Sequence, residues 1–177
     1  MSGKTRVKTA ARRGAGAGAN ASAGGVSLDA HVPDFSLPAT GGETVRLKQL
    51  AGSTVVLYFY PRDDTPGCTL EGREFAALLP RFRRAGASVF GISRDSIASH
   101  EKFRDKMGYP FALLSDADEQ VCRLFDVIRE KNMYGRKVFG IERSTFLIDA
   151  AGVLRREWRK LKVEGHALEV LAAAQAL

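Results

Sequence analysis

The sequence has few cysteines and no long apolar run. Its 177 residues include two cysteines, Cys68 and Cys122, and three histidines. Two cysteines do not build the disulfide framework of a small secreted domain, and their spacing to the histidines matches no zinc motif. No apolar run approaches the ~20 residues of a membrane-spanning helix, and no secretory h-region stands near the start. We therefore expect a cytoplasmic protein without a disulfide scaffold, a structural zinc or a membrane partner.

Positive charge is concentrated at one end of the chain. Five of the charges behind the formal net charge of +7 lie within residues 1–25, which contain no acidic residue. Ala and Gly dominate the rest of this segment, so we predict a disordered basic Gly/Ala-rich tail over residues 1–26. The tail is either a solubilising extension or a weak contact for a polyanion. It lacks interleaved aromatic residues, so we do not expect nucleic acid as a partner.

The most informative segment surrounds Cys68. The residues at 54–60 are apolar, β-branched or aromatic, which is typical of a strand covered on both faces. Pro61 ends this strand. Pro66 suits the first position of a helix, and Thr65 suits the N-cap, where a hydroxyl oxygen can accept an unpaired backbone N–H. Cys68 is then the third helical residue, where free N–H groups and the helix dipole favour a thiolate.

The alternative for Cys68 is a small buried hydrophobic residue. Its neighbours are Thr, Pro, Gly and Thr rather than an apolar stripe, which favours a reactive thiol. The remaining pattern is a βαβ unit, an inserted segment and a ββα unit, and it predicts one α/β domain over residues 27–177. The expected elements are a hairpin around 41–42, strands at 54–60, 88–92, 111–114, 144–149 and 153–158, helices at about 66–85, 97–107, 121–128 and 165–176, and a loop over 130–140.

This order of elements, with a thiol where the first helix begins, resembles the thioredoxin superfamily. Position 65 is Thr, so the C-x-x-C of a dithiol oxidoreductase is absent. Pro61, Thr65 and Cys68 instead match the Pro-x-x-x-Thr-x-x-Cys signature of peroxiredoxins of the AhpC/TSA type. Further motifs resemble the bacterioferritin comigratory protein, or Q-type, branch: Thr69-x-Glu71, Gly91-Ile92-Ser93, Ser115-Asp116, Tyr134-Gly135-Arg136, residues 140–149 and Glu164-Gly165-His166.

The resemblance covers about residues 27–177 and implies a thioredoxin-like fold. That fold is a central mixed β-sheet flanked by helices, here with an N-terminal β-hairpin extension. The implied activity is that of a thiol peroxidase, which reduces hydrogen peroxide and organic hydroperoxides to water and alcohols. The resemblance implies no metal and no organic cofactor, and it favours a monomer, with a dimer as the alternative.

The resemblance also implies the roles of five residues. Cys68 would be the peroxidatic cysteine, which attacks the peroxide and becomes a sulfenic acid. Thr65 would hydrogen-bond the peroxide and the thiolate, and Pro61 would shield the sulfur from solvent. Arg143 would stabilise the thiolate and polarise the O–O bond, and Glu71 would hold this arginine. Fixed donors of this kind suit a reaction that expels hydroxide or alkoxide.

Each role has a structural alternative when the residues are considered alone. Thr65 could be only a helix cap, and Arg143 a solvated charge. Glu71 could be a first-turn acid that the helix dipole favours. We expect the three histidines, His31, His100 and His166, to be surface or capping residues rather than catalysts.

The sequence departs from the Q-type branch at the recycling step, because Arg73 and Arg104 occupy the two usual positions of a resolving cysteine. Cys122 is either a half-buried structural cysteine or an unusual resolving cysteine, within the chain or between chains. We therefore expect a one-cysteine mechanism in which an external thiol, from thioredoxin, glutaredoxin or glutathione, reduces sulfenic Cys68. The alternatives are a two-cysteine mechanism through Cys122, a redox sensor that uses Cys68 oxidation as its signal, and a polyanion-binding module acting through the tail.

Overall fold

A computed structural model of the chain describes residues 25–177. Residues 1–24 of the tail predicted over 1–26 lie outside the described residues. The main sheet has seven strands and is mixed, because β3 and β4 run parallel, β4 and β5 run parallel, and the outer pairs are antiparallel. In sheet order its strands are β2 (Glu43–Arg46), β1 (Ser36–Ala39), β5 (Leu113–Ser115), β4 (Ala87–Ser93), β3 (Thr54–Phe59), β8 (Ser144–Ile148) and β9 (Leu154–Arg159).

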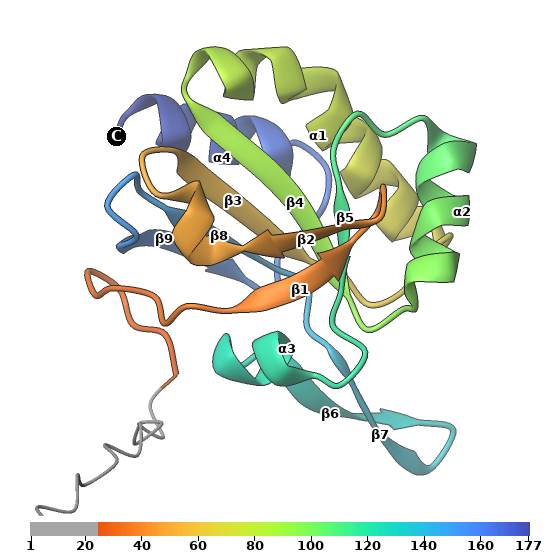
Figure 1. The fold of residues 1–177 in the computed structure, drawn as a ribbon. Helices are drawn as coiled ribbons and strands as arrows, with labels where there is room; N and C mark the ends of the chain where they lie inside the picture. The colour runs from red at the N-terminus through yellow and green to blue at the C-terminus, as the bar shows by residue number, and fades with distance from the viewer. Residues whose placement is uncertain (1–24) are drawn as a thin grey trace, which may run out of the picture.

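Helices complete this α/β architecture, as predicted (Figure 1). They are the 3-10 helix η1 (Leu47–Leu50) and the α-helices α1 (Pro66–Arg84), α2 (Ile97–Met107), α3 (Gln120–Leu124) and α4 (His166–Gln175). The β1–β2 pair confirms the expected N-terminal hairpin. The predicted positions of α1, α2 and α4 are confirmed, whereas α3 ends at Leu124 rather than near 128.

Alternate residues of β3 divide the core into two clusters, one on each face of the sheet. Val56, Tyr58 and Tyr60 pack with the buried residues of α1 and α4 in the cluster that contains Cys68. Val55, Leu57 and Phe59 belong to the other cluster, which contains Cys122 of α3. The continuous apolar run at 54–60 is explained by this double coverage.

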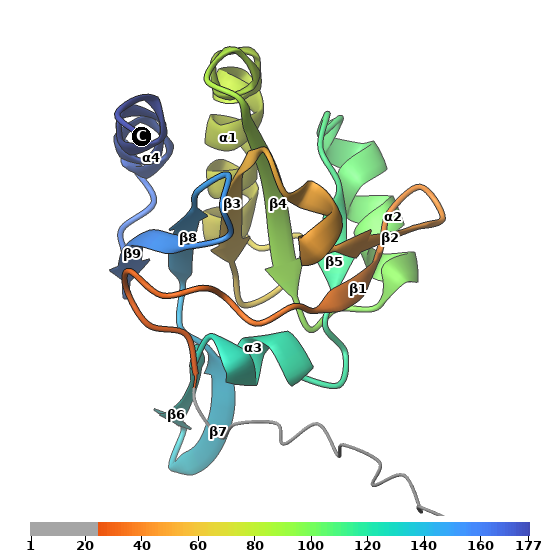
Figure 2. The same cartoon turned by 60° about the vertical axis from the view of Figure 1, so that its left-hand side comes forward.

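The loop predicted over 130–140 is wrong. This segment forms a hairpin of β6 (Ile128–Met133) and β7 (Arg136–Ile141), a separate two-stranded sheet. Tyr134 and Gly135 connect the strands with φ values of 54° and 77°, which is the left-handed pair that a two-residue hairpin turn needs. The many polar and basic residues obscured the strand pattern, because the hairpin projects beside α3 and exposes most of its side chains (Figures 1 and 2).

Candidate active site

Cys68 lies where the sequence predicted it, in the first turn of α1 just beyond the carboxyl end of β3. Its side chain is almost fully buried, with 2% exposed. Pro66 is the first residue of the helix, and the N–H of Thr69 donates to the carbonyl of Thr65 at 2.9 Å. The N–H groups of Gly67 and Cys68 have no helical carbonyl before them to bind. They are the donors that a helix start offers to an anion or an oxyanion.

Thr65 is the N-cap residue, but the prediction that its hydroxyl caps the helix is wrong. The hydroxyl donates to the carbonyl oxygen of Arg62 at 3.0 Å and accepts no backbone N–H of α1. The bond to Arg62 closes the turn between β3 and α1. Since the proton of the hydroxyl is used in that bond, the lone pairs on Oγ1 remain available to accept a hydrogen bond from a ligand.

Arg143 reaches Cys68 from the strand β8, the neighbour of β3 in the sheet. It immediately precedes β8, and β8 pairs antiparallel with β3 so that Ser144 lies opposite Phe59. This register places Arg143 at the carboxyl end of β3, beside the start of α1. Its Nη2 donates to Sγ of Cys68 at 3.3 Å, and its Nη1 donates to Oε1 of Glu71 at 3.0 Å.

The Arg143–Glu71 pair is mostly buried. Desolvation would lower the pKa of Arg143, but its interactions with Glu71 and Cys68 outweigh desolvation and raise that pKa, so the guanidinium stays cationic. Burial raises the pKa of Glu71 to about 7, although Arg143 pulls it down. The second oxygen of Glu71, Oε2, has no hydrogen-bond partner among the described residues. The site therefore holds a permanent cation against the sulfur and a carboxyl group that titrates near neutral pH.

Close packing of glycines shapes this site, a feature that the sequence analysis missed. A Cβ on Gly67 would lie 3.1 Å from Nη2 of Arg143, and one on Gly72 would lie 2.3 Å from the ring of Tyr109. The Tyr109 hydroxyl donates to the carbonyl of Thr69 at 3.1 Å. Gly72 stands in the interior of a predicted helix, where glycine is unfavourable, and this was the available signal of a close approach.

The other predicted site residues lie in two different places. Pro61, partly buried, precedes Thr65 in the turn that leads to Cys68. Cys122, in contrast, is completely buried in the cluster on the opposite face of the sheet, so the expectation of a half-buried residue is wrong. Burial and the neighbouring Asp116 raise the pKa of its thiol far above the ordinary value. Both cysteines are free thiols.

Two of the three histidines are not surface residues. His100 and His166 are buried, because α2 and α4 turn them toward the sheet, whereas His31 is exposed as expected. His166 places Nε2 2.8 Å from Oγ1 of Thr145, and burial lowers its pKa to about 4, so the ring is neutral at neutral pH.

Asp63, Asp95 and His100 form a group whose possible metal-ligand atoms lie within 4.8 Å of one another. Nε2 of His100 lies 2.9 Å from the carbonyl oxygen of Leu114, and its Nδ1 lies 2.8 Å from Oδ2 of Asp63. Both ring nitrogens thus already bind protein oxygens. The geometry of this group is explained by hydrogen bonds within the chain and does not require a metal ion.

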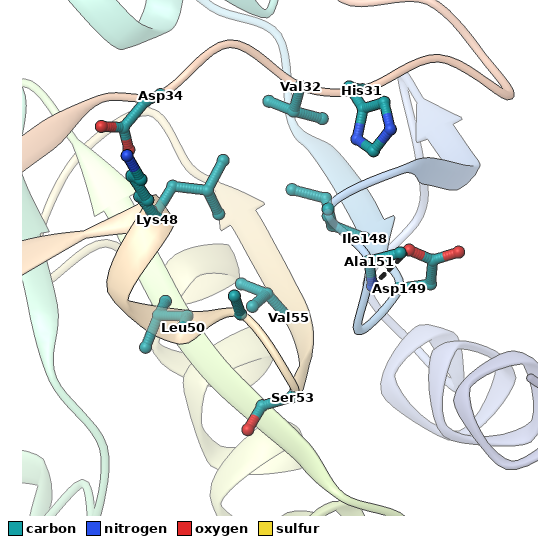
Figure 3. A pocket seen from close by; sticks show the side chains of 13 residues that line it. His31, Val32, Asp34, Lys48, Leu50, Ser53, Val55, Ile148, Asp149 and Ala151 are labelled. Atoms are coloured by element: carbon teal, nitrogen blue, oxygen red, sulfur yellow. Dashed lines mark hydrogen bonds between the residues drawn. The ribbon is translucent and has the colours of Figure 1, made fainter.

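A cavity of about 200 Å³ lies at the other end of β3. Figure 3 shows Val55, at the start of β3, and Ile148, at the end of β8, on its apolar floor. His31, Asp34 and Asp149 lie around it. The cavity contains no cysteine and lies at the end of β3 opposite to Cys68, so it is not the candidate active site.

The chain is similar to known proteins over most of its length. A model of the AhpC/TSA family matches residues 28–157. Peroxiredoxin Bcp of Xanthomonas campestris pv. campestris is 54% identical over 151 residues, which are 85% of this chain and 94% of the relative. Peroxiredoxin Bcp of Bacillus subtilis is 44% identical over 146 residues, which are 82% of this chain and 93% of that relative.

Solved structures give the same result. A structure of the bacterioferritin comigratory protein of Xanthomonas campestris, from work on its alkyl peroxide reduction activity, matches with a TM-score of 0.80 and 54% identity. It covers 85% of this chain and 96% of the matched chain. Among the described residues, no helix has the length and apolarity to cross a membrane. The chain belongs to the AhpC/TSA family and is a peroxiredoxin of the bacterioferritin comigratory protein, or Q-type, branch, an enzyme that reduces peroxides with a thiol.

Proposed function

We propose that Cys68 reduces hydrogen peroxide and organic hydroperoxides by a one-cysteine mechanism. The observation that carries this proposal is the 3.3 Å contact between Nη2 of Arg143 and Sγ of Cys68 at the start of a helix. A cation and a helix N-terminus both favour the thiolate over the thiol. The thiolate is the nucleophile that the reaction needs.

In the proposed step the thiolate attacks one oxygen of the peroxide. A sulfur–oxygen bond forms while the O–O bond breaks, so the sulfur loses two electrons and becomes a sulfenic acid. The leaving hydroxide or alkoxide takes a proton and departs as water or an alcohol. Arg143 and the N–H groups of Gly67 and Cys68 stabilise the negative charge that develops on the oxygens.

Thr65 and Pro61 act on the peroxide rather than on the sulfur alone. The Thr65 hydroxyl donates to Arg62, so its oxygen accepts the O–H of the bound peroxide and fixes which oxygen faces Cys68. Pro61 supplies no N–H and excludes water from the sulfur. Glu71 orients Arg143 through the 3.0 Å hydrogen bond, which leaves the second nitrogen of the guanidinium for the sulfur.

We further propose that an external thiol recycles the enzyme. It attacks the sulfenic sulfur, expels water and forms a mixed disulfide, which a second thiol then reduces. Cys122 is completely buried and belongs to the core cluster on the other face of the sheet, so it would have to leave the core to reach Cys68. Thioredoxin, glutaredoxin and glutathione are the candidate reductants. Free thiols are typical of a reducing compartment, so we propose a cytoplasmic location, and a monomer by similarity to the Q-type branch.

The test is the intact mass of the protein after one equivalent of hydrogen peroxide, with and without a sulfenic-acid trap. It is done on the wild type and on Cys122→Ser. We expect one trapped adduct, at Cys68, in both proteins. Loss of two hydrogens in the wild type, replaced by an adduct in Cys122→Ser, would make Cys122 the resolving cysteine. No reaction at Cys68 would exclude the peroxidase mechanism, and reaction without turnover by any of the three reductants would favour the sensor.

A further inference from the structure

The turn that carries Pro61 and Thr65 is tied to the rest of the protein by a buried polar network. At its centre is Asp63, whose side chain is almost completely buried. The mechanism proposed above uses Pro61 and Thr65 but not Asp63. A buried carboxylate is costly unless it is paired, so its presence in this turn needs an explanation.

Each oxygen of Asp63 receives hydrogen bonds from side chains of other elements. The hydroxyl of Tyr60, the residue after β3, donates to Oδ1 at 2.7 Å, and the hydroxyl of Ser99, in α2, donates to Oδ2 at 2.7 Å. Nδ1 of His100, also in α2, lies 2.8 Å from Oδ2. Asp63 also uses its backbone, because its N–H donates to Oδ2 of Asp95 at 2.9 Å.

Both ring nitrogens of His100 face hydrogen-bond acceptors. Nε2 lies 2.9 Å from the carbonyl oxygen of Leu114, and a carbonyl oxygen only accepts. Burial alone would raise the pKa of Asp63, but the hydrogen bonds from His100 and Tyr60 hold it below the ordinary value, so Asp63 is a carboxylate. A carboxylate also only accepts, and this one faces Nδ1. His100 thus bridges Asp63 in the turn and Leu114 in β5 through its two ring nitrogens.

The network joins the carboxyl ends of β3, β4 and β5, the three parallel strands of the sheet. Ser93 at the end of β4 donates to Oδ2 of Asp95 at 2.5 Å, and Ser115 at the end of β5 donates to the carbonyl of Asp95 at 2.6 Å. The turn that leads to Cys68 is thereby hydrogen-bonded, through Asp95, to the ends of two neighbouring strands.

Two features connect this network to the peroxide site. Arg62, whose carbonyl accepts the Thr65 hydroxyl, is the immediate neighbour of Asp63, so fixing Asp63 restricts where that carbonyl lies. Asp64, on the other side, has a φ of 57°, a left-handed conformation that is unfavourable for a residue other than glycine. Such a conformation persists only when surrounding contacts hold it in place. Lys106 of α2 holds Asp64 directly, because its Nζ donates to both carboxylate oxygens at 2.9 and 3.0 Å. His100 and Ser99 hold the preceding residue, Asp63.

We propose that the hydrogen-bonded pair of His100 and Asp63 is a positioning device for the peroxide site. It holds the Pro61–Thr65 turn over Cys68, and thereby sets how fast the thiolate reacts with peroxide. Neither residue touches the sulfur or the substrate. The inference rests on the proposed function, because the rate of peroxide attack by Cys68 is the quantity that the pair controls.

The test uses two isosteric variants of His100. In His100→Asn the amide nitrogen replaces Nδ1 and can still donate to Asp63, whereas in His100→Gln it replaces Nε2 and can donate only toward Leu114. A third variant, Asp63→Asn, keeps the shape of the acceptor without its charge. A core variant, Val170→Ala in α4, loses stability on the same face of the sheet without touching the turn.

Two rates are measured for each variant: oxidation of Cys68 by hydrogen peroxide in rapid mixing with mass detection, and alkylation of Cys68 by iodoacetamide. We expect the peroxide rate to fall ~10-fold to ~100-fold in His100→Gln and Asp63→Asn, because a misplaced site loses orientation. His100→Asn should retain most of the rate. The alkylation rate should not fall, because Arg143 still holds the thiolate and a loosened turn uncovers it.

Unchanged peroxide rates in His100→Gln and Asp63→Asn would overturn the inference. The inference would also be overturned if both rates fell in these variants and fell equally in a Val170→Ala protein with the same midpoint of urea unfolding. Lost stability alone would then explain the effect. If His100→Gln does not fold, Ser99→Ala is the substitute, because it removes a single hydrogen bond to Asp63. In Ser99→Ala the peroxide rate should fall while the alkylation rate does not. An unchanged peroxide rate would contradict the inference. A wild type that does not react with peroxide would instead refute the proposed function.

Discussion

Nη2 of Arg143 lies 3.3 Å from Sγ of Cys68, although 75 positions separate the two residues in the chain. The contact exists because β8 pairs antiparallel with β3 and brings the residue before β8 to the start of α1. Glu71 completes it by binding the other terminal nitrogen of the same guanidinium. The sulfur thus faces a cation whose orientation is set by two hydrogen bonds, one from each terminal nitrogen of the guanidinium.

Replacing Arg143 with lysine should abolish most of the peroxidase activity although it keeps the positive charge. A single ammonium group cannot bind Glu71 and the sulfur with the geometry of the planar guanidinium. We expect the second-order rate constant of Cys68 oxidation by hydrogen peroxide to fall ~100-fold or more, the magnitude that loss of one preorganised donor produces. Arg155→Lys, which changes an exposed arginine paired with Asp149, is the matched control. Equal rates in the two variants would contradict the role of the guanidinium.

Replacing Glu71 with glutamine should change how stability depends on pH. Burial raises the pKa of Glu71 in the folded protein to about 7, above its ordinary value of 4.5. The folded state therefore binds the proton more tightly than the unfolded state. The resulting stabilisation is fully present below pH 4.5 and is lost as the pH rises through about 7.

This contribution amounts to at most about 3 kcal/mol across that range. The measurement is urea unfolding of wild type and Glu71→Gln at several pH values between 4 and 8. We expect the wild type to lose stability relative to Glu71→Gln as the pH rises. The difference between the proteins is the informative quantity, because His166, whose pKa is lowered to about 4, contributes an opposite slope in both. Parallel curves would show that Glu71 does not titrate in this range.

Gly72→Ala should destabilise the protein and disturb the start of α1. The new Cβ would lie 2.3 Å from the ring of Tyr109, and that ring is held by its hydrogen bond to Thr69. We expect a loss of about 2 kcal/mol or more in the free energy of unfolding, from overpacking of a buried site. The measurement is urea unfolding of the single variant and of Gly72→Ala with Tyr109→Leu, in which a smaller side chain should relieve part of the loss.

Gly140→Ala is the control for this prediction, because its Cβ would meet Lys131 atoms at 3.7 Å or more, an ordinary contact. Its stability should stay close to that of the wild type. If Gly72→Ala is as stable as Gly140→Ala, helix α1 can move away from Tyr109 and the packing does not constrain the site.

Cys122 should resist alkylation in the folded protein while Cys68 reacts. Burial and the neighbouring Asp116 raise the pKa of the Cys122 thiol, and the side chain has no exposed surface. The reactive species is the thiolate, so the native protein should take up a single iodoacetamide adduct. Peptide mapping locates it, and addition of urea should release the second site. Rapid alkylation of Cys122 without denaturant would mean that α3 opens easily, and it would revive the two-cysteine alternative.

Local patterns in the sequence determined much of the site. The apolar run at 54–60 predicted β3, and Pro66 predicted the first residue of α1, which placed Cys68 as the third helical residue. These predictions succeed because strand burial, proline geometry and helix starts depend on neighbouring residues. The assignment of Arg143 to the site came from the resemblance, since spacing alone left it as a possible solvated charge.

Only the tertiary structure decided which distant residues meet and which face of the sheet each one joins. The strand pairing of β3 with β8 brought Arg143 to Cys68, and the packing of α3 on the opposite face separated Cys122 from it. Burial of His100 against Asp63 had no local signal either, because its two partners lie on elements far apart in the chain. Contacts of this kind depend on strand order and register, which arise from the packing of the whole core rather than from any single segment.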